Sequence, residues 1–152
     1  MNIEKYLNDL ELQLLDKKNW RNFITNRSFT STIPKEPGVY IILENENIVY
    51  AGESGNLQAR INDFLDTRNH SLRRKLGKNL FNKKQGFIMG TAKIKFPSKI
   101  EILLNKHIQK YFIISFLKIN LGRKELEERI VNSMQKEFKL NVRGKRKSTI
   151  IK

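Results

Sequence analysis

The chain has 152 residues, enough for one compact domain that buries most of its apolar surface and too few for two domains of ordinary size. It contains no cysteine, which excludes disulfides, thiolate nucleophiles and cysteine-ligated zinc, and two histidines are too few for an all-protein zinc site. The net charge of +15 indicates a polyanionic partner, and any metal ion should be a hard one bound through oxygen.

The positive charge is concentrated in the second part of the chain. Residues 1–66 carry 7 Lys/Arg against 10 Asp/Glu, whereas residues 67–152 carry 23 against 5, and the stretch 67–99 contains no acid at all. This distribution favours nucleic acid as the partner. Because no apolar run reaches eighteen residues and the amino terminus does not read as a leader, we expect a cytoplasmic protein without membrane contact.

The first elements in chain order are a helix and a hairpin. Apolar residues at helical spacing predict a helix over 3–16, and the prolines at 34 and 37 exclude helix before a strand that begins at Gly38. Two β-rich runs, 39–43 and 48–51, flank a predicted four-residue loop, 44–47. That loop would place Tyr40 and Tyr50 on opposite faces, and an odd loop length would place them on one face; the sequence leaves both registers open.

The remaining elements are mostly helical. Periodicity predicts helices over 57–66, 70–81, 100–111 and 123–137, a strand over 112–119, and a loop with a short strand over 87–96. Arg60 and Glu127 each fall on an otherwise apolar helix face, where a charge is costly unless it serves a polar site. The predicted class is α+β, with a small three-stranded antiparallel sheet flanked by helices.

Four spaced motifs carry the chemistry. A tyrosine hydroxyl can accept a proton or orient a water, and an arginine binds phosphate oxygens in pairs, so the combination suits phosphodiester chemistry. The motifs are Gly38-Val39-Tyr40, Tyr50-Ala51-Gly52, Arg60 reached through Asn56-Leu57, and a late Leu126-Glu127-Glu128 followed by Asn141. In this order and spacing they resemble the GIY-YIG nuclease family.

That resemblance implies hydrolysis of DNA with one divalent cation, Mg²⁺ or Mn²⁺. Tyr40 would act as general base or orient the attacking water, with Tyr50 beside it, Arg60 would stabilise charge on the phosphate, and Glu127 would hold the metal. The resemblance divides the chain into a helix and extended lead-in packed on the core (1–36), the nuclease domain (37–141) and a basic tail (142–152), all in one compact unit. The supporting residues would be Gly38, Gly52, Asn56 and Asn141.

Other interpretations of these residues stay open. Both tyrosines could be ordinary half-buried strand residues, Glu127 could be a first-turn glutamate interchangeable with Glu125 or Glu128, and Asn141 could only cap a helix exit. Many members of the family carry a histidine or tyrosine where this chain has Phe64. We predict that His70, or otherwise Lys75, supplies the proton donor instead, and that His107 is a packed or hydrogen-bonded helix residue.

Three functions follow, in order of support. The first is a Mg²⁺-dependent DNA endonuclease of restriction or repair type, for which a homodimer would help to cut both strands. The second is a catalytically silent nucleic-acid-binding module with the same fold, and the third is an RNA-binding protein of ribosomal type. The predicted DNA-binding residues are Arg68, Arg73, Arg74, Lys75, Lys78, Lys83, Lys84, Arg143, Lys145 and Arg146.

Overall fold

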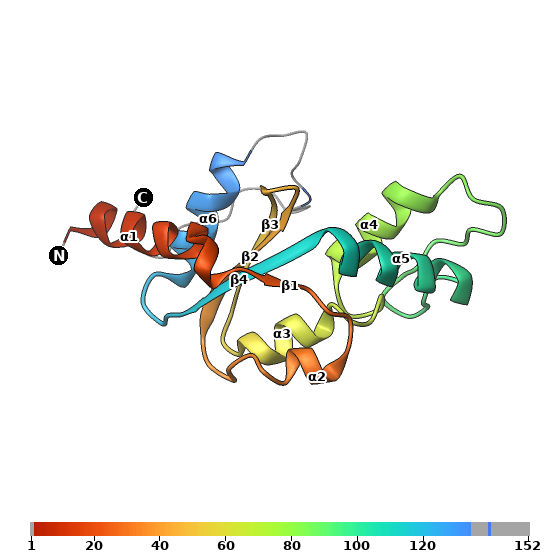
Figure 1. The fold of residues 1–152 in the computed structure, drawn as a ribbon, viewed down its shortest axis with the longest axis horizontal. Coiled ribbons are helices and arrows are strands. Elements are labelled where there is room, and N and C mark those ends of the chain that lie inside the picture. Colours follow the sequence, from red (N-terminus) through yellow and green to blue (C-terminus); the bar gives the residue numbers. More distant parts are fainter. Residues whose placement is uncertain (1, 135–139, 141–152) are drawn as a thin grey trace.

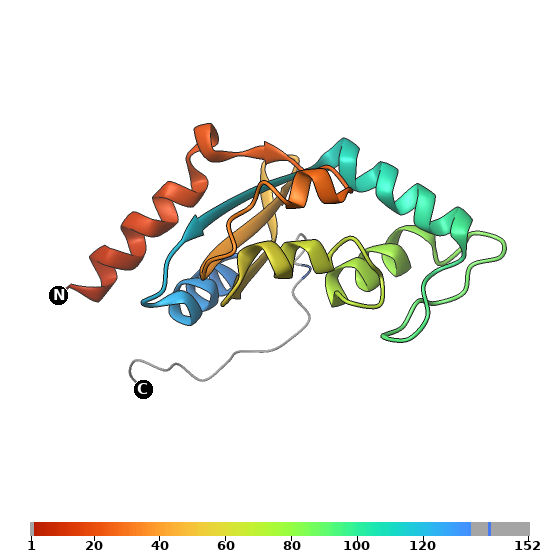
Figure 2. The same cartoon turned by 90° about the horizontal axis from the view of Figure 1, so that it is seen from below.

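The computed structural model describes residues 2–134 and 140 and consists of one antiparallel sheet with helices on both faces (Figures 1 and 2). The strand order is β1-β4-β2-β3. The strands are β1 (Arg21–Asn22), β2 (Gly38–Glu44), β3 (Asn47–Ser54) and β4 (Phe112–Lys118). The helices are α1 (Ile3–Leu15), α2 (Arg27–Thr30), α3 (Leu57–Asp63), α4 (Ser71–Phe81), α5 (Ser98–Tyr111) and α6 (Arg123–Ser133), with a 3-10 turn, η1 (Lys17–Asn19), after α1.

The α+β class is confirmed, but the sheet has one strand more than predicted. The fourth strand, β1, is two residues long and pairs Arg21 with Ile114 and Asn22 with Ile113 of β4. A strand this short shows no alternation of apolar and polar residues, which is why the sequence does not reveal it. No strand occurs in the 82–97 segment between α4 and α5, where a short one was predicted.

The hairpin of β2 and β3 settles the register that the sequence left open. Leu43 pairs with Ile48, as a four-residue loop over 44–47 requires, but Glu44 also pairs with Asn47, so the strands extend one residue further than predicted on each side. The turn has only two residues, Asn45 and Glu46, both with positive φ (53° and 65°). Two left-handed residues in succession match the right-handed twist of a tight hairpin, although a glutamate is an uncommon choice for the second.

A β-bulge then decides which face Tyr50 occupies. Leu43 pairs with Ile48, but Ile42 pairs with Tyr50 and Tyr40 with Gly52, so Val49 is an extra residue in β3. The bulge shifts the side-chain alternation by one position and turns Tyr50 to the same face as Tyr40. The backbone N–H of Leu140 donates to the carbonyl of Val49 (2.6 Å), which places Leu140 against β3 at this bulge.

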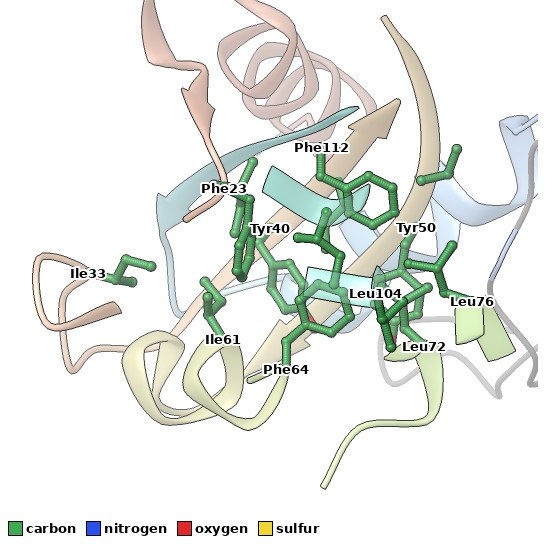
Figure 3. Close-up of a cluster of buried hydrophobic side chains, with 14 of the residues drawn as sticks. Phe23, Ile33, Tyr40, Tyr50, Ile61, Phe64, Leu72, Leu76, Leu104 and Phe112 are labelled. Carbon is green, nitrogen blue, oxygen red and sulfur yellow. The ribbon is translucent and has the colours of Figure 1, made fainter. Parts of the chain in front are cut away.

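The sheet separates two hydrophobic cores because β2 is central and buried on both faces. The α1/α6 core contains Val39, Ile41, Leu43 and Ala51 from the sheet, with Leu7, Leu10, Leu14, Leu126 and Ile130 from the helices. The tyrosine-side core, drawn in Figure 3, contains Tyr40, Ile42 and Tyr50, with Leu57, Ile61, Phe64, Leu72, Leu76, Leu104 and Ile108 from α3, α4 and α5 and the segments between them. Both tyrosines therefore face α3 and α4.

The helices α4 and α5 form a pair that extends away from the sheet, joined by the 82–97 segment at its far end (Figures 1 and 2). Among residues 2–134 and 140, no helix has the length and apolar character needed to cross a bilayer. The last helix, predicted over 123–137, ends at Ser133, because Met134 has an extended backbone (φ −70°, ψ 143°); residues 135–137 lie outside the described residues.

Candidate active site

Tyr40 and Tyr50 lie beside each other on the tyrosine-side face of the sheet. Their ring centroids are 6.1 Å apart, on neighbouring strands in diagonal positions. Tyr40 is 1 % exposed and its ring covers Gly52, where an added Cβ would stand 2.5 Å from Tyr40 Cζ. A larger residue at position 52 would therefore clash with the Tyr40 ring.

Arg60 approaches the tyrosines from α3 and is more exposed than either tyrosine, with 32 % of its side chain accessible. One guanidinium nitrogen lies 3.5 Å from Asp63 Oδ2 and donates to the Asn69 carbonyl at 3.4 Å. The helix begins at Asn56, whose side chain accepts from the Ala59 N–H (3.0 Å), so Asn56 acts as the N-cap of α3. Asp63 is a member of this site that the sequence analysis missed, although an acid three residues after an arginine on a helix is a recognisable pairing signal.

His70 lies behind Tyr40, with its Nε2 at 3.3 Å from the Tyr40 hydroxyl and its ring packed on Phe64 and Tyr50. Its other nitrogen, Nδ1, accepts from the Leu72 N–H (3.1 Å) and caps α4. A nitrogen that accepts carries no proton, so the proton of the neutral ring is on Nε2. His70 therefore donates to the Tyr40 oxygen.

Glu127 lies on α6, which packs in the α1/α6 core, on the face of the sheet opposite the tyrosine-side core. It is 2 % exposed, whereas its neighbours Glu125 and Glu128 are only half-buried, which agrees with the choice of Glu127 over those two. Helix α6 packs on β3 and β2, and Leu126 and Ile130 belong to the α1/α6 core. The start of α6 is tied to the end of β3 by an ion pair between Arg123 and Glu53 (3.0 Å).

A family model described as the GIY-YIG catalytic domain matches residues 17–151 of the chain. The chain belongs to the GIY-YIG family. Comparison with curated proteins and with solved structures gave no match. The family is one of nucleases, so the predicted resemblance is confirmed. The match begins at residue 17, ahead of β1 and of the first predicted motif at Gly38.

The departure from the GIY-YIG pattern at Phe64 has a structural explanation. Phe64 caps the end of α3 and is buried against Phe23 (5.2 Å between ring centroids) and Phe112 (6.3 Å) (Figure 3). It therefore belongs to the core, and the imidazole that contacts Tyr40 and Tyr50 is that of His70, which caps the beginning of α4. The predicted alternative, Lys75, lies further along α4 and is half-buried.

Burial favours the neutral forms of Tyr40 and His70. Burial raises the pKa of Tyr40 well above its ordinary value, Tyr50 raises it further, and Arg60 opposes both. Burial also lowers the pKa of His70 to about 3, and the charges of Arg60 and Arg74 add to that effect. His70 is thus a hydrogen-bond donor rather than an acid at neutral pH, and a neutral Tyr40 suits orientation of a water better than its deprotonation.

The lowered pKa of His70 predicts a specific loss of stability in mild acid. The unfolded histidine takes up a proton below about pH 6.5 and the folded one only near pH 3, so protonation favours the unfolded state. The His70 contribution is complete above pH 6.5 and declines by about 1.4 kcal/mol per pH unit as the pH falls toward 3. Asparagine would retain the cap without titrating, so denaturant unfolding of wild type and His70→Asn at pH 7 and pH 5 should differ in pH slope; parallel slopes would exclude a buried neutral His70.

The residues fit a hard divalent cation. Glu127 offers a carboxylate oxygen, and no group of three or more His, Asp or Glu that could cage a metal occurs in the described part of the chain. Mg²⁺ keeps most of its water and binds through one or two carboxylates plus phosphate oxygens, so a single carboxylate is a suitable protein contribution.

The predicted DNA-binding set needs one correction. Arg73 is 1 % exposed, and its guanidinium donates to Glu101 (2.7 Å), to the Thr67 hydroxyl (3.0 Å) and to the Phe64 carbonyl (3.3 Å). It joins α4 to α5 and is not available to phosphates. His107, as predicted, is hydrogen-bonded, with its Nε2 at 3.0 Å from Glu44.

Other members of the set remain at the surface or outside the description. Arg74 is half-buried and donates to the carbonyls of Thr67 and Arg68, while Arg68 pairs with Asp66. Lys78, Lys83 and Lys84 are exposed. Asn141, Arg143, Lys145 and Arg146 lie outside the described residues.

Proposed function

We propose that the chain is a divalent-metal-dependent DNA endonuclease that hydrolyses phosphodiester bonds at the cluster of Tyr40, Tyr50, Arg60 and His70. The observation that carries the proposal is that the side chains of this cluster lie at increasing depth from the surface, with Arg60 outermost. His70 and Tyr40 are both 1 % exposed and share a hydrogen bond that His70 donates, Tyr40 packs on Tyr50, which is 8 % exposed, and Arg60 reaches the surface. A phosphate would meet Arg60 first, with the tyrosines directly behind it.

Each side chain then has a distinct task. Arg60, held by Asp63 and the Asn69 carbonyl, presents its guanidinium to the phosphate and stabilises charge that develops there. Tyr40 has a fixed orientation because His70 occupies one lone pair of its oxygen, so with Tyr50 it orients a water for attack on phosphorus. Glu127 would hold Mg²⁺ or Mn²⁺, which supplies positive charge to the phosphate oxygens.

The proposed partner is DNA, bound by the exposed Lys78 of α4 and by the exposed Lys83 and Lys84 of the following segment. Phosphate contacts position a duplex without reading its sequence. A restriction or repair role is compatible with this arrangement, and a homodimer would place two sites on opposite strands.

A catalytically silent binding module is the second candidate, and Phe64 is the observation that favours it. The structure weakens that argument, because Phe64 is a core residue and an imidazole already contacts Tyr40. A silent module would also have no need for a buried Glu127.

Incubation of wild type with supercoiled plasmid in Mg²⁺, Mn²⁺ or EDTA tests the proposed function. We expect nicked and linear products with either metal and none with EDTA. DNA binding without cleavage under every metal condition would favour the silent module instead.

A further inference from the structure

The segment 82–97, which joins α4 to α5, combines exposed aliphatic side chains with lysines. Ile88 is 65 % exposed and Ile94 62 %, and Met89 between them is also exposed. Lys93 and Lys95 flank Ile94, and Lys83 and Lys84 precede the tip. Isolated exposed apolar residues are ordinary, but three on one loop between lysines form a small amphipathic surface, here called the 88–94 tip.

The 88–94 tip is held in place from below by buried contacts. Phe87 and Phe96 pack together at both ends of it (5.6 Å between ring centroids), and the Phe96 N–H donates to Glu101 (2.9 Å). Glu101 also binds the buried Arg73, so the loop base shares the network that joins α4 to α5. Gly90 leaves room for Thr67 and Phe96, which an added Cβ would contact.

Within the tip, a tight turn points Ile94 outward. The Thr91 N–H donates to the Ile94 carbonyl (2.7 Å), and the Thr91 hydroxyl accepts from the Lys93 and Ile94 N–H groups (3.1 Å each). The aliphatic residues are therefore exposed on a loop whose backbone is hydrogen-bonded and whose base is packed. A loop backbone fixed in this way has less conformational entropy to lose when a partner covers its side chains.

We propose that the 88–94 tip inserts its aliphatic side chains into a groove of duplex DNA while the flanking lysines hold the phosphates on either side. The inference rests on the proposed function. Charge complementarity selects the partner, because residues 67–99 contain ten basic residues and no acid. Aliphatic wedges placed between base steps are a known means of bending duplex DNA, and bending depends on sequence, so the tip would contribute to the choice of cleavage site.

The test is binding of the full chain, in EDTA to prevent cleavage, to short duplexes that carry 2-aminopurine and end-labels for bending. Wild type should raise the 2-aminopurine fluorescence and shorten the end-to-end distance. The double variant Ile88→Ser/Ile94→Ser should bind about tenfold more weakly, lose both signals and keep the salt dependence of wild type. Lys93→Ala/Lys95→Ala should instead reduce the salt slope by about 1.8, because two phosphate contacts are lost.

Leu12→Ser is the matched control, since Leu12 is 58 % exposed on α1, away from this loop. It should bind and bend DNA as wild type does. Equal affinity and equal 2-aminopurine signal for Ile88→Ser/Ile94→Ser and wild type would overturn the inference, even if plasmid cleavage upholds the proposed function. Isoleucine-dependent binding to phosphatidylglycerol vesicles, with DNA binding unchanged, would overturn it in favour of a membrane surface.

Discussion

Glu127→Gln is expected to lower the rate of Mg²⁺-dependent DNA cleavage by about 10³-fold, because the amide has nearly the same shape but no charge to hold a cation. Glu127 is 2 % exposed, so the substitution changes charge at a buried position without leaving a cavity. DNA binding in EDTA should persist, since the metal is absent in both proteins. Single-turnover cleavage of a labelled duplex over a range of Mg²⁺ concentrations measures the effect.

Glu128→Gln is the matched control for this experiment. Glu128 is the next residue of α6 and is only half-buried. Glu128→Gln therefore removes the same charge from the same helix as Glu127→Gln. Its cleavage rate and Mg²⁺ dependence should equal those of wild type. If Glu127→Gln cut DNA as fast as Glu128→Gln, the metal would have to be held elsewhere.

Arg60→Ala is expected to have a comparable effect, with a loss of about 10² to 10³-fold in the cleavage rate at saturating DNA. Arg60 is the member of the cluster that reaches the surface, and its guanidinium hydrogen-bonds to Tyr40 and Tyr50 and lies 3.5 Å from Asp63 and 3.4 Å from the Asn69 carbonyl. Partly exposed ion pairs of this kind contribute little to stability, so unfolding should change by less than about 1 kcal/mol. The measurements are single-turnover cleavage and denaturant unfolding.

Arg27→Ala removes an exposed arginine from α2, which packs beside α3, and serves as the control. Its cleavage rate should match wild type. If Arg60→Ala alone lowers the cleavage rate and still binds DNA nearly as well as wild type, Arg60 acts on the reacting phosphate. A loss of binding alone would reduce Arg60 to one of many phosphate contacts.

The sequence predicted the elements well where apolar periodicity is strong. The helices around Leu7, Leu104 and Ile130 and the strands that carry Tyr40 and Tyr50 occur within a few residues of their predicted positions. Periodicity reports burial of one face, and these segments each bury a face against the sheet or one another. The family itself could be inferred from four motifs because their spacing reflects one shared scaffold.

The relation between the two tyrosines could not be predicted. It depends on the bulge at Val49, an extra residue whose side chain is as apolar as its neighbours, and on a turn of Asn45 and Glu46 without the glycine that usually marks positive φ. Register is a property of the pair of strands rather than of either strand alone. One unpaired residue reverses the face of every side chain that follows it.

The distribution of charge along the sequence also did not reveal which basic side chains are buried. The acid-free stretch that contains Arg73 predicts a DNA-binding residue there, but the partner of Arg73, Glu101, is 28 positions away and on another helix. Only the pairing of α4 with α5 brings the two together. The sequence also predicts that His70 takes the place of the histidine or tyrosine missing at Phe64. The contact between His70 and the Tyr40 hydroxyl gives this prediction a geometric basis.

The most direct measurement for the central claim is single-turnover cleavage of a DNA duplex by wild type and Tyr40→Phe in Mg²⁺. Phenylalanine keeps the ring in the core and over Gly52 and removes only the hydroxyl that His70 and Tyr50 orient. A cleavage rate about 10²-fold below wild type, with DNA affinity unchanged, is the predicted result. Cleavage by Tyr40→Phe at the wild-type rate would show that the buried tyrosine cluster does not carry the reaction.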